Sequence, residues 1–218
     1  MLTLGLDWTS PPIGHVLCLG AHCDDIELGC GGTVHKLIEE HPALTVTWVV
    51  WTSTDLRAAE ARTSARALLA HAKSADVAIH DFRDGFLPSQ SAALKEAFES
   101  LKHRIAPDVI FTHYRADLHQ DHRLVSELTW NTFRDHVILE YEIPKFDGDL
   151  GSPNVFVPLD GSQCSRKIDH LTTHFPSQAD RRWFSEETFR AILRLRGLEA
   201  NAPHGYAEGF YARKLLLG

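Results

Sequence analysis

HVLCLGA, residues 15–21, is the stretch that decides the fold, because it is an almost unbroken run of apolar side chains. Runs of this kind are typical of strands that are buried on both faces of a parallel sheet. The run ends at the polar segment His22–Asp25 (HCDD), and the glycine-rich segment Gly29–Thr33 follows. This change of character predicts that the strand reaches the edge of its sheet at His22.

Strand and helix patterns alternate along the rest of the chain. This alternation predicts an α/β fold: a Rossmann-like, doubly wound parallel sheet flanked by helices on both faces. No linker or internal repeat interrupts the pattern, so we expect residues 1–218 to form a single domain. The expected strands are 15–21, 44–53, 77–82, 108–112, 137–143, 154–159 and 206–217, and the expected helices are 34–41, 55–72, 91–105, 121–135, 164–175 and 185–195.

Composition narrows the class of protein. The net charge of −7 argues against a nucleic-acid partner, which usually needs a basic face. The four cysteines form no C-x-x-C pair, which favours reduced thiols and a cytoplasmic location. The first 20 residues lack the basic start and apolar core of a signal peptide, and we find no apolar run long enough for a membrane span.

Two polar clusters follow expected strands. The first is His22–Asp25, with one imidazole and two carboxylates; its aspartates could also simply cap the next helix. The second is His119–His122 (HQDH), whose two histidines are spaced to point to the same side of a helical turn. Taken alone, each cluster is a weak signal. Because ligands bind beyond the carboxyl ends of parallel strands, both clusters are expected at the same edge of the sheet.

Together the clusters point to metal chemistry. Two imidazoles and one carboxylate are the ligand set of a catalytic zinc, which keeps a position open for water. Zinc lowers the pKa of that water to about 7, a second carboxylate can act as general base, and a further histidine can stabilise the oxyanion. The sequence therefore predicts a hydrolase that uses a zinc-bound water.

The same residues carry a resemblance to a known family. The motifs A-H-C-D-D, G-C-G-G-T and H-Q-D-H resemble those of the LmbE-like (PIG-L) zinc N-deacetylases, and further segments such as D-G-F-L-P (84–88) and Y-A-E-G-F (206–210) fit as well. The resemblance covers nearly the whole chain. It implies a substrate with an N-acetylated amino sugar, such as an N-acetylglucosamine glycoside, and it is compatible with a homo-oligomer as well as a monomer.

The resemblance also implies roles for individual residues. His22, Asp25 and His122 would bind zinc, and Asp24 would be the general base. His119 would stabilise the oxyanion or act as an acid, with Asp121 orienting it and raising its pKa. Arg57 falls where the family often places a substrate-binding arginine, although a plain helix-surface charge explains it equally well.

Several alternatives stay open at this stage. Cys23 stands where the family usually has proline or alanine, so it could be a zinc ligand or a nucleophile, although a side chain pointing into the core is the better interpretation. The glycines of residues 29–32 lack the spacing of a phosphate-binding loop, and we interpret them as backbone that passes close to the metal. A metal-dependent amidohydrolase acting on a non-sugar N-acyl amine, or a non-catalytic binding protein, would share many of these features. The sequence does not identify the sugar, its aglycone or the acyl group.

Overall fold

The structure is a computed structural model that describes residues 13–216. The first 20 residues, which do not resemble a signal peptide, lie mostly outside this described range. The first half of the chain alternates strands and helices. Its elements are β1 (His15–Gly20), α1 (Asp25–Glu40), β2 (Thr45–Thr52), α2 (Asp55–Leu68), β3 (Ser74–Phe82), the short 3-10 helix η1 (Leu87–Gln90), α3 (Ser91–Lys102) and β4 (Val109–His113).

The second half contributes both to the same sheet and to its helical cover. It begins with a helix and ends with a strand. Its elements are α4 (Gln120–Thr132), β5 (Val137–Tyr141), β6 (Val155–Leu159), α5 (Gly161–His174), the 3-10 helix η2 (Pro176–Gln178), α6 (Glu186–Glu199) and β7 (Tyr206–Ala212).

The strands form one seven-stranded sheet in the order β3-β2-β1-β4-β5-β7-β6. The strands β1 to β5 run parallel, as predicted. The strand β7 is inserted antiparallel between β5 and β6, so the sheet is mixed at this edge. The chain order reverses between β1 and β4, and the carboxyl ends of these two strands are where an open α/β sheet binds its ligands.

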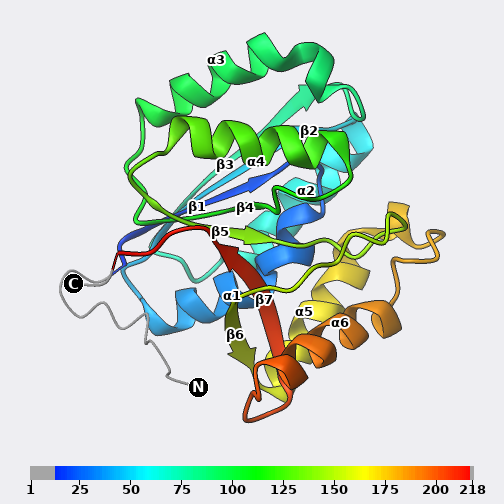
Figure 1. Ribbon diagram of the computed structural model, residues 1–218. Coiled ribbons are helices and arrows are strands. Elements are labelled where there is room, and N and C mark those ends of the chain that lie inside the picture. Colours follow the sequence, from blue (N-terminus) through cyan, green and yellow to red (C-terminus); the bar gives the residue numbers. More distant parts are fainter. Residues whose placement is uncertain (1–12, 217–218) are drawn as a thin grey trace.

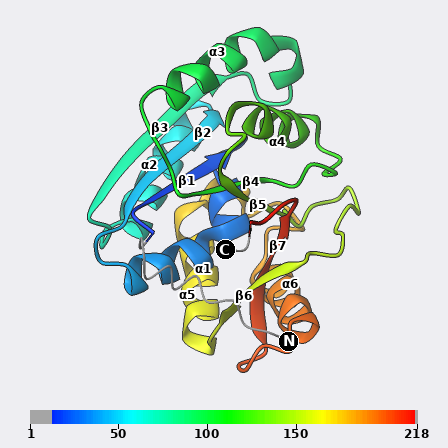
Figure 2. The same cartoon turned by 60° about the vertical axis from the view of Figure 1, so that its left-hand side comes forward.

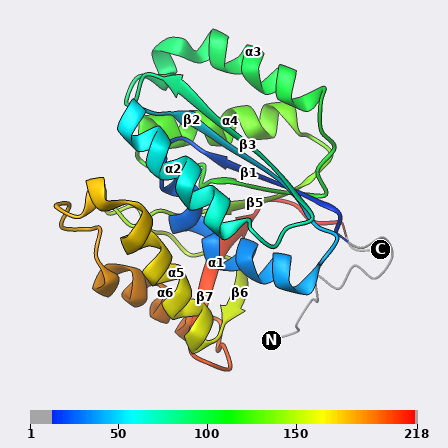
Figure 3. The ribbon, with the colours of Figure 1, turned by 180° about the vertical axis from the view of Figure 1, so that it is seen from behind.

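Helices cover both faces of the sheet, as expected (Figure 1). Along β1, Val16 and Cys18 pack into the core on the side of α1, α2, α5 and α6, while Leu17 and Leu19 pack into the core under α3 and α4. Figure 3 shows α2, α1 and α5 on the first of these faces. The alternation follows from the two-residue period of a strand, and it explains why β1 is apolar on both sides.

The main difference from the predicted elements is the start of α1. We expected a glycine turn and a helix from about residue 34, but α1 begins at Asp25 and contains all the glycines of residues 29–32. Gly29 and Gly32 make room for other elements. A Cβ atom on Gly29 would lie 2.1 Å from the ring of Tyr141 on β5. The expected glycine turn is therefore wrong: these residues are helical, and Gly29 lets the helix approach the sheet.

The other boundaries differ by a few residues. β7 ends at Ala212, short of the expected residue 217, which itself lies outside the described part of the chain. Within residues 13–216, no helix is long and apolar enough to cross a membrane. All four cysteines are buried and unpaired.

Candidate metal centre

Both polar clusters lie at the same edge of the sheet. His22–Asp25 follow β1 directly and lead into the first turn of α1. His119 is the N-cap of α4, and Asp121 and His122 occupy its first turn. The clusters meet because β1 and β4 are neighbouring parallel strands. Their convergence, expected from the sequence, is thus present in the structure.

Three donor atoms converge at this edge. His22 Nδ1 lies 3.0 Å from His122 Nε2 and 3.3 Å from Asp25 Oδ2, and His122 Nε2 lies 3.6 Å from Asp25 Oδ2. Two ligands of a tetrahedral zinc, each about 2.05 Å from the ion, are about 3.3 Å apart. The spacing of the three predicted ligands therefore fits zinc.

The protonation states of His122 and Asp25 also fit a metal centre. Burial lowers the pKa of His22, but nearby carboxylates raise it well above the usual value in the metal-free protein, so a bound metal has to displace that proton. Burial, with His113 stacked against the ring, lowers the pKa of His122 to about 3, so its imidazole is neutral. Burial favours the neutral form of Asp25, but the surrounding His122, His22 and His113 hold the pKa of its carboxyl well below the usual range. A neutral imidazole and an ionised carboxylate are the forms that bind a metal.

Asp117 organises the second cluster, and sequence reasoning missed it. Its Oδ2 is 2.9 Å from His122 Nδ1, which leaves Nε2 of that ring to face Asp25 and His22. Its Oδ1 accepts the backbone N–H of His119 at 2.8 Å. Metal-ligating histidines usually donate their other ring N–H to a carboxylate in this way. The D-x-H-x-D-H spacing of residues 117–122 is the signal that could have revealed it.

Asp117 is itself held from a distant part of the chain. Lys145 Nζ, from the loop after β5, lies 2.9 Å from Asp117 Oδ2 and 2.5 Å from Asp149 Oδ2. Asp149 in turn accepts the backbone N–H of Leu118 at 2.7 Å. The loop after β5 is therefore joined to the histidine ligand through two charged contacts.

Asp24 and Arg57 form a partly buried pair. Arg57 Nη2 donates to Asp24 Oδ1 at 2.8 Å, and Arg57 Nε is 3.6 Å from Glu60 Oε2. The other oxygen of Asp24, Oδ2, is buried and has no hydrogen-bond partner among the described residues. Burial raises the pKa of Asp24 and Arg57 opposes that shift. The structure thus shows Arg57 against the predicted base, and its contact with a substrate stays a prediction.

His119 is oriented by backbone. The backbone N–H of Asp121 donates to His119 Nδ1 at 3.3 Å, so the neutral ring carries its proton on Nε2. Burial and the neighbouring His22 lower the pKa of His119, although Asp121 acts in the opposite direction. The expected rise of this pKa is therefore wrong. The reason is that, in the metal-free site, burial and the protonated His22 together outweigh the carboxylate of Asp121.

The carboxylate of Asp121 serves a different segment. Its oxygens accept the backbone N–H groups of Gly85 (2.8 Å) and Leu87 (3.1 Å), and Oδ2 lies 3.4 Å from His22 Nε2. Gly85 has a φ of +76°, a conformation that favours glycine. Asp121 thus fixes the loop before η1, and this loop places Asp84 Oδ1 3.1 Å from His22 Nε2. An orienting role of Asp121 toward His119 stays a prediction.

The site contains more potential ligands than the three predicted ones. Sequence reasoning also missed His113, at the end of β4, whose Nε2 lies 3.1 Å from Asp25 Oδ2 and 2.9 Å from the backbone nitrogen of Ala21. The described residues include three groups whose donor atoms lie within 4.8 Å of one another: His22, His119 and His122; Asp25, His113 and His122; and His22, Asp84 and Asp121. His22 or His122 belongs to every group, which supports their place at the centre.

Cys23 points away from these groups. Its side chain is 2% exposed and packs in the core, and its Sγ is 3.5 Å from the backbone oxygen of Thr52. Burial raises the pKa of its thiol to about 12. A thiol that stays protonated and faces the core is unsuited to be either a ligand or a nucleophile.

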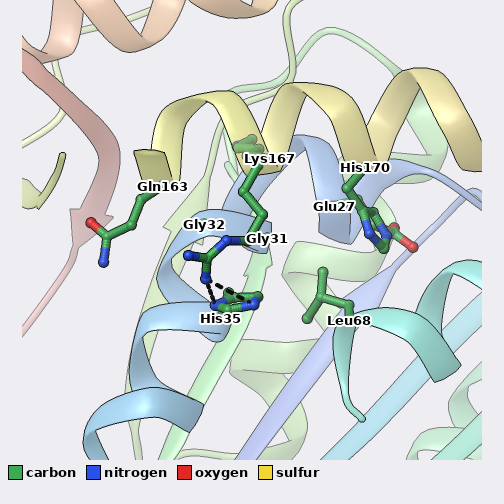
Figure 4. Close-up of a pocket in the computed structure, with 9 residues that line it drawn as sticks. Glu27, Gly31, Gly32, His35, Leu68, Gln163, Lys167 and His170 are labelled. Carbon is green, nitrogen blue, oxygen red and sulfur yellow. Dashed lines mark hydrogen bonds between the residues drawn. The ribbon is translucent and has the colours of Figure 1, made fainter. Parts of the chain in front are cut away.

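A small cavity of about 30 Å³ lies behind the site, between α1, α2 and α5 (Figure 4). Its wall includes the buried Glu27, which forms no salt bridge with any of the described residues. The carboxyl group of Glu27 accepts a hydrogen bond from Ser64. Ser64 Oγ is also 2.8 Å from His170 Nε2. Burial raises the pKa of Glu27 to about 8. The carboxyl group is thus protonated through most of the neutral range.

Comparison with known proteins gives the family. Residues 17–133, more than half of the chain, match the family model described as PIG-L: GlcNAc-PI de-N-acetylase. The chain belongs to the PIG-L family. The matched residues include both polar clusters of the metal centre. The uncharacterized deacetylase YaiS of Escherichia coli (strain K12) is 32% identical over 173 residues, which cover 73% of this chain and 89% of YaiS.

Solved structures share the fold. The N,N'-diacetylchitobiose deacetylase from Pyrococcus horikoshii superposes with a TM-score of 0.70 at 21% identity, covering 96% of this chain and 87% of that chain. The 4-carboxy-2-hydroxymuconate hydratase GalB from Pseudomonas putida KT2440 superposes with a TM-score of 0.71 at 16% identity, covering 94% of this chain and 98% of that chain. Because a deacetylase and a hydratase share this PIG-L fold, the fold alone does not decide the reaction.

Proposed function

We propose that this PIG-L family member is a zinc-dependent N-deacetylase that acts on an N-acetylated amino sugar or glycoside of the N-acetylglucosamine type. The observation that carries the proposal is the convergence of His22 Nδ1, Asp25 Oδ2 and His122 Nε2 at 3.0–3.6 Å. The choice of an amino sugar rests on the name of the family model and on the chitobiose deacetylase that shares the fold.

Two neighbouring aspartates have different roles: Asp25 is a metal ligand and Asp24 is the general base. When bound, zinc supplies a Lewis acid that polarises the amide carbonyl and makes a water molecule more acidic. Asp24 is the carboxylate that remains after Asp25 is assigned to the metal. Because Arg57 holds Asp24 Oδ1, Oδ2 is the atom that takes the proton from the attacking water. The same carboxyl group then returns the proton to the departing nitrogen.

His119 stabilises the negative charge that develops on the carbonyl oxygen. Its Nδ1 accepts a backbone N–H, so the proton on Nε2 is available to the substrate. A neutral imidazole can fill this role as a hydrogen-bond donor, which agrees with the lowered pKa of His119. Arg57 contacts the sugar as well as the base in this proposal, which its position beside Asp24 and the 22% exposure of its side chain support.

The test is an acetate-release screen with the zinc-loaded protein. The panel contains N-acetylglucosamine, chitobiose and aryl N-acetylglucosaminides, together with N-acetyl amino acids as non-sugar amides. We expect acetate from at least one sugar and none from the amino acids, with activity lost on chelation and restored by zinc. Release from N-acetyl amino acids alone would establish the alternative amidohydrolase. Activity that survives chelation but not thiol alkylation would instead assign the chemistry to Cys23.

A further inference from the structure

A strongly basic hollow lies along α4, apart from the metal centre. We call it the α4 groove; its volume is about 660 Å³, which is within the size range of ligand pockets. It contains five cationic side chains and a single acidic one, in a chain whose net charge is −7. None of the residues of the metal centre lines it. The lining residues are Arg115, Arg123, Glu127, Trp130, Asn131, Arg134, Arg213 and Lys214.

A buried carboxylate fixes the groove from below. Glu140 on β5 is fully buried, and it accepts hydrogen bonds from Trp130 Nε1 (2.6 Å) and the backbone N–H of Arg115 (3.0 Å). Its Oε1 is also 3.4 Å from Arg213 Nη2, and the Arg213 guanidinium lies 4.1 Å from the centre of the Trp130 ring. These contacts hold both walls in place, so the groove is a built feature and not a chance group of mobile side chains.

The segment after β7 forms the second wall. Lys214 Nζ donates to the backbone oxygen of Arg134 at 2.8 Å and ties this segment to the end of α4. Figure 2 shows the red segment after β7 running below α4. The two walls come from parts of the chain about 80 residues apart.

Three of the five cations have no carboxylate partner. Within residues 13–216, Arg123, Arg134 and Lys214 form no salt bridge, and their hydrogen bonds go to backbone oxygens. All three side chains are exposed. Cations held close together without counter-charges repel one another, and an anion between them relieves that repulsion.

We propose that the α4 groove binds a soluble ligand that carries several phosphate groups. Four of the five cations are arginines, whose planar guanidinium matches the oxygens of a phosphate. Arg123 lies near the start of α4 and Arg134 follows its end at Thr132, so the cations are spread along the length of the helix, which suits a row of charges and not a single ion. The concave shape favours a molecule over a flat lipid surface. This site is separate from the proposed deacetylation.

The test is calorimetric titration of the full zinc-loaded chain with inorganic tripolyphosphate and, in parallel, with orthophosphate. The variant is Arg134→Glu/Lys214→Glu, which reverses the charge of two groove cations that donate hydrogen bonds to backbone oxygens. The matched control is Arg62→Glu/Arg66→Glu, which reverses two exposed charges on α2 that form no salt bridge among the described residues. Any heat from capture of zinc by the probe is common to all three proteins.

We expect tripolyphosphate to bind the wild type at least about tenfold more tightly than orthophosphate, and to lose at least about tenfold in affinity in the groove variant. The control should change little, and added salt should weaken the binding. Equal losses in both variants, or no preference for tripolyphosphate, would overturn the proposal. The proposal would also be overturned if the protein did not bind tripolyphosphate but sedimented with vesicles that contain phosphatidylglycerol, and if the groove variant lost this sedimentation. That result would make the groove a lipid-binding surface. Acetate release is not a readout here, so failure of this proposal leaves the proposed function untouched.

Discussion

The two segments that supply the candidate metal centre, His22–Asp25 and Asp117–His122, are held in place differently. In the first, the same segment holds Asp25: its Oδ2 accepts the backbone N–H of His22 at 2.6 Å, and Asp25 is already the first residue of α1. The other two polar residues of this segment also have distant partners, Arg57 on Asp24 and Asp84 beside His22. The second depends on distant partners. Asp117 is held by Lys145 from the loop after β5, and Asp121 is held by the loop before η1.

This difference has a consequence for mutational effects. A change in the first segment acts on the metal centre directly. The second segment can also be disturbed from a distance, because its charged contacts connect the metal centre to two loops. We therefore expect remote substitutions to weaken metal binding through His122 and not through Asp25.

The largest effect should come from the ligands, one in each segment. We expect His22→Ala and His122→Ala each to abolish stoichiometric zinc binding, because each removes one of only three protein ligands. Metal analysis after dialysis measures this, with the exposed His103→Ala as the matched histidine control. Full zinc content in both variants would show that other members of the histidine cluster are the true ligands.

Asp24→Asn should lower kcat by about 10²–10⁴-fold while zinc content stays at the wild-type level. The amide keeps an oxygen for Arg57 but cannot accept a proton from water. Steady-state kinetics together with metal analysis separates this from ligand loss. Near-wild-type kcat would remove Asp24 from the mechanism and leave the first segment with a purely metal-binding role.

For the second segment, the matching substitution is His119→Ala. We expect a loss of about 10²–10³-fold in kcat, with a similar KM and unchanged zinc affinity, because the side chain donates to the oxyanion and does not bind the metal. Chelator competition measures the affinity. If His119→Ala lost zinc while His122→Ala kept it, the roles of the two histidines would be exchanged.

Asp117→Asn should weaken zinc binding by about 10–100-fold, because a neutral amide holds the His122 ring less strongly than a carboxylate. Lys145→Met should also weaken zinc binding, but by a smaller factor, because Lys145 acts only through Asp117. Titration against a chromophoric chelator measures both, with Lys95→Met as the surface control. No effect of Lys145→Met would break the proposed dependence of the second segment on distant loops.

The smallest effect concerns stability along α1, the continuation of the first segment. Burial raises the pKa of Glu27 to about 8, so the folded protein holds this proton more tightly than the unfolded chain, in which the pKa is about 4.3. The resulting stability is complete below about pH 4 and is lost as the pH rises through about 8. Glutamine mimics the protonated carboxyl group. We therefore expect Glu27→Gln to gain on the wild type as the pH rises.

Thermal unfolding of both proteins at pH 5, 7 and 9 measures this difference. Each kcal/mol of difference in the free energy of unfolding corresponds to a difference of about 2–4 °C in Tm for a chain of this size. The two proteins should have similar Tm values at pH 5 and diverge at pH 9. Parallel pH profiles would show that Glu27 does not titrate in this range.

Most element positions could be predicted because the patterns that set them are local. The apolar runs of β1 and β4 identify strands buried on both faces, and the alternation of strands with helices implies a parallel order. Parallel order then brings the residues that follow β1 and β4 to one edge. That is why the convergence of His22, Asp25 and His122 could be foreseen.

The start of α1 could not be predicted in the same way. Several glycines close together, as in residues 29–32, favour a turn when only local preferences are considered. At Gly29 the actual reason is the ring of Tyr141, more than a hundred residues away, which leaves no space for a Cβ atom. Packing between distant elements therefore outweighed the local preference of these glycines for a turn.

The sequence by itself determined the α/β class, the position of both polar clusters and the ligand types available to a metal, because these depend on short-range patterns and on the order of strands. Only the tertiary structure decided which groups hold the side chains of the site: Asp117 on His122, Lys145 on Asp117 and Arg57 on Asp24. It also decided the antiparallel insertion of β7 and, with it, the second wall of the α4 groove. The physical reason is that hydrogen bonds and ion pairs between distant residues depend on geometry that no local pattern encodes.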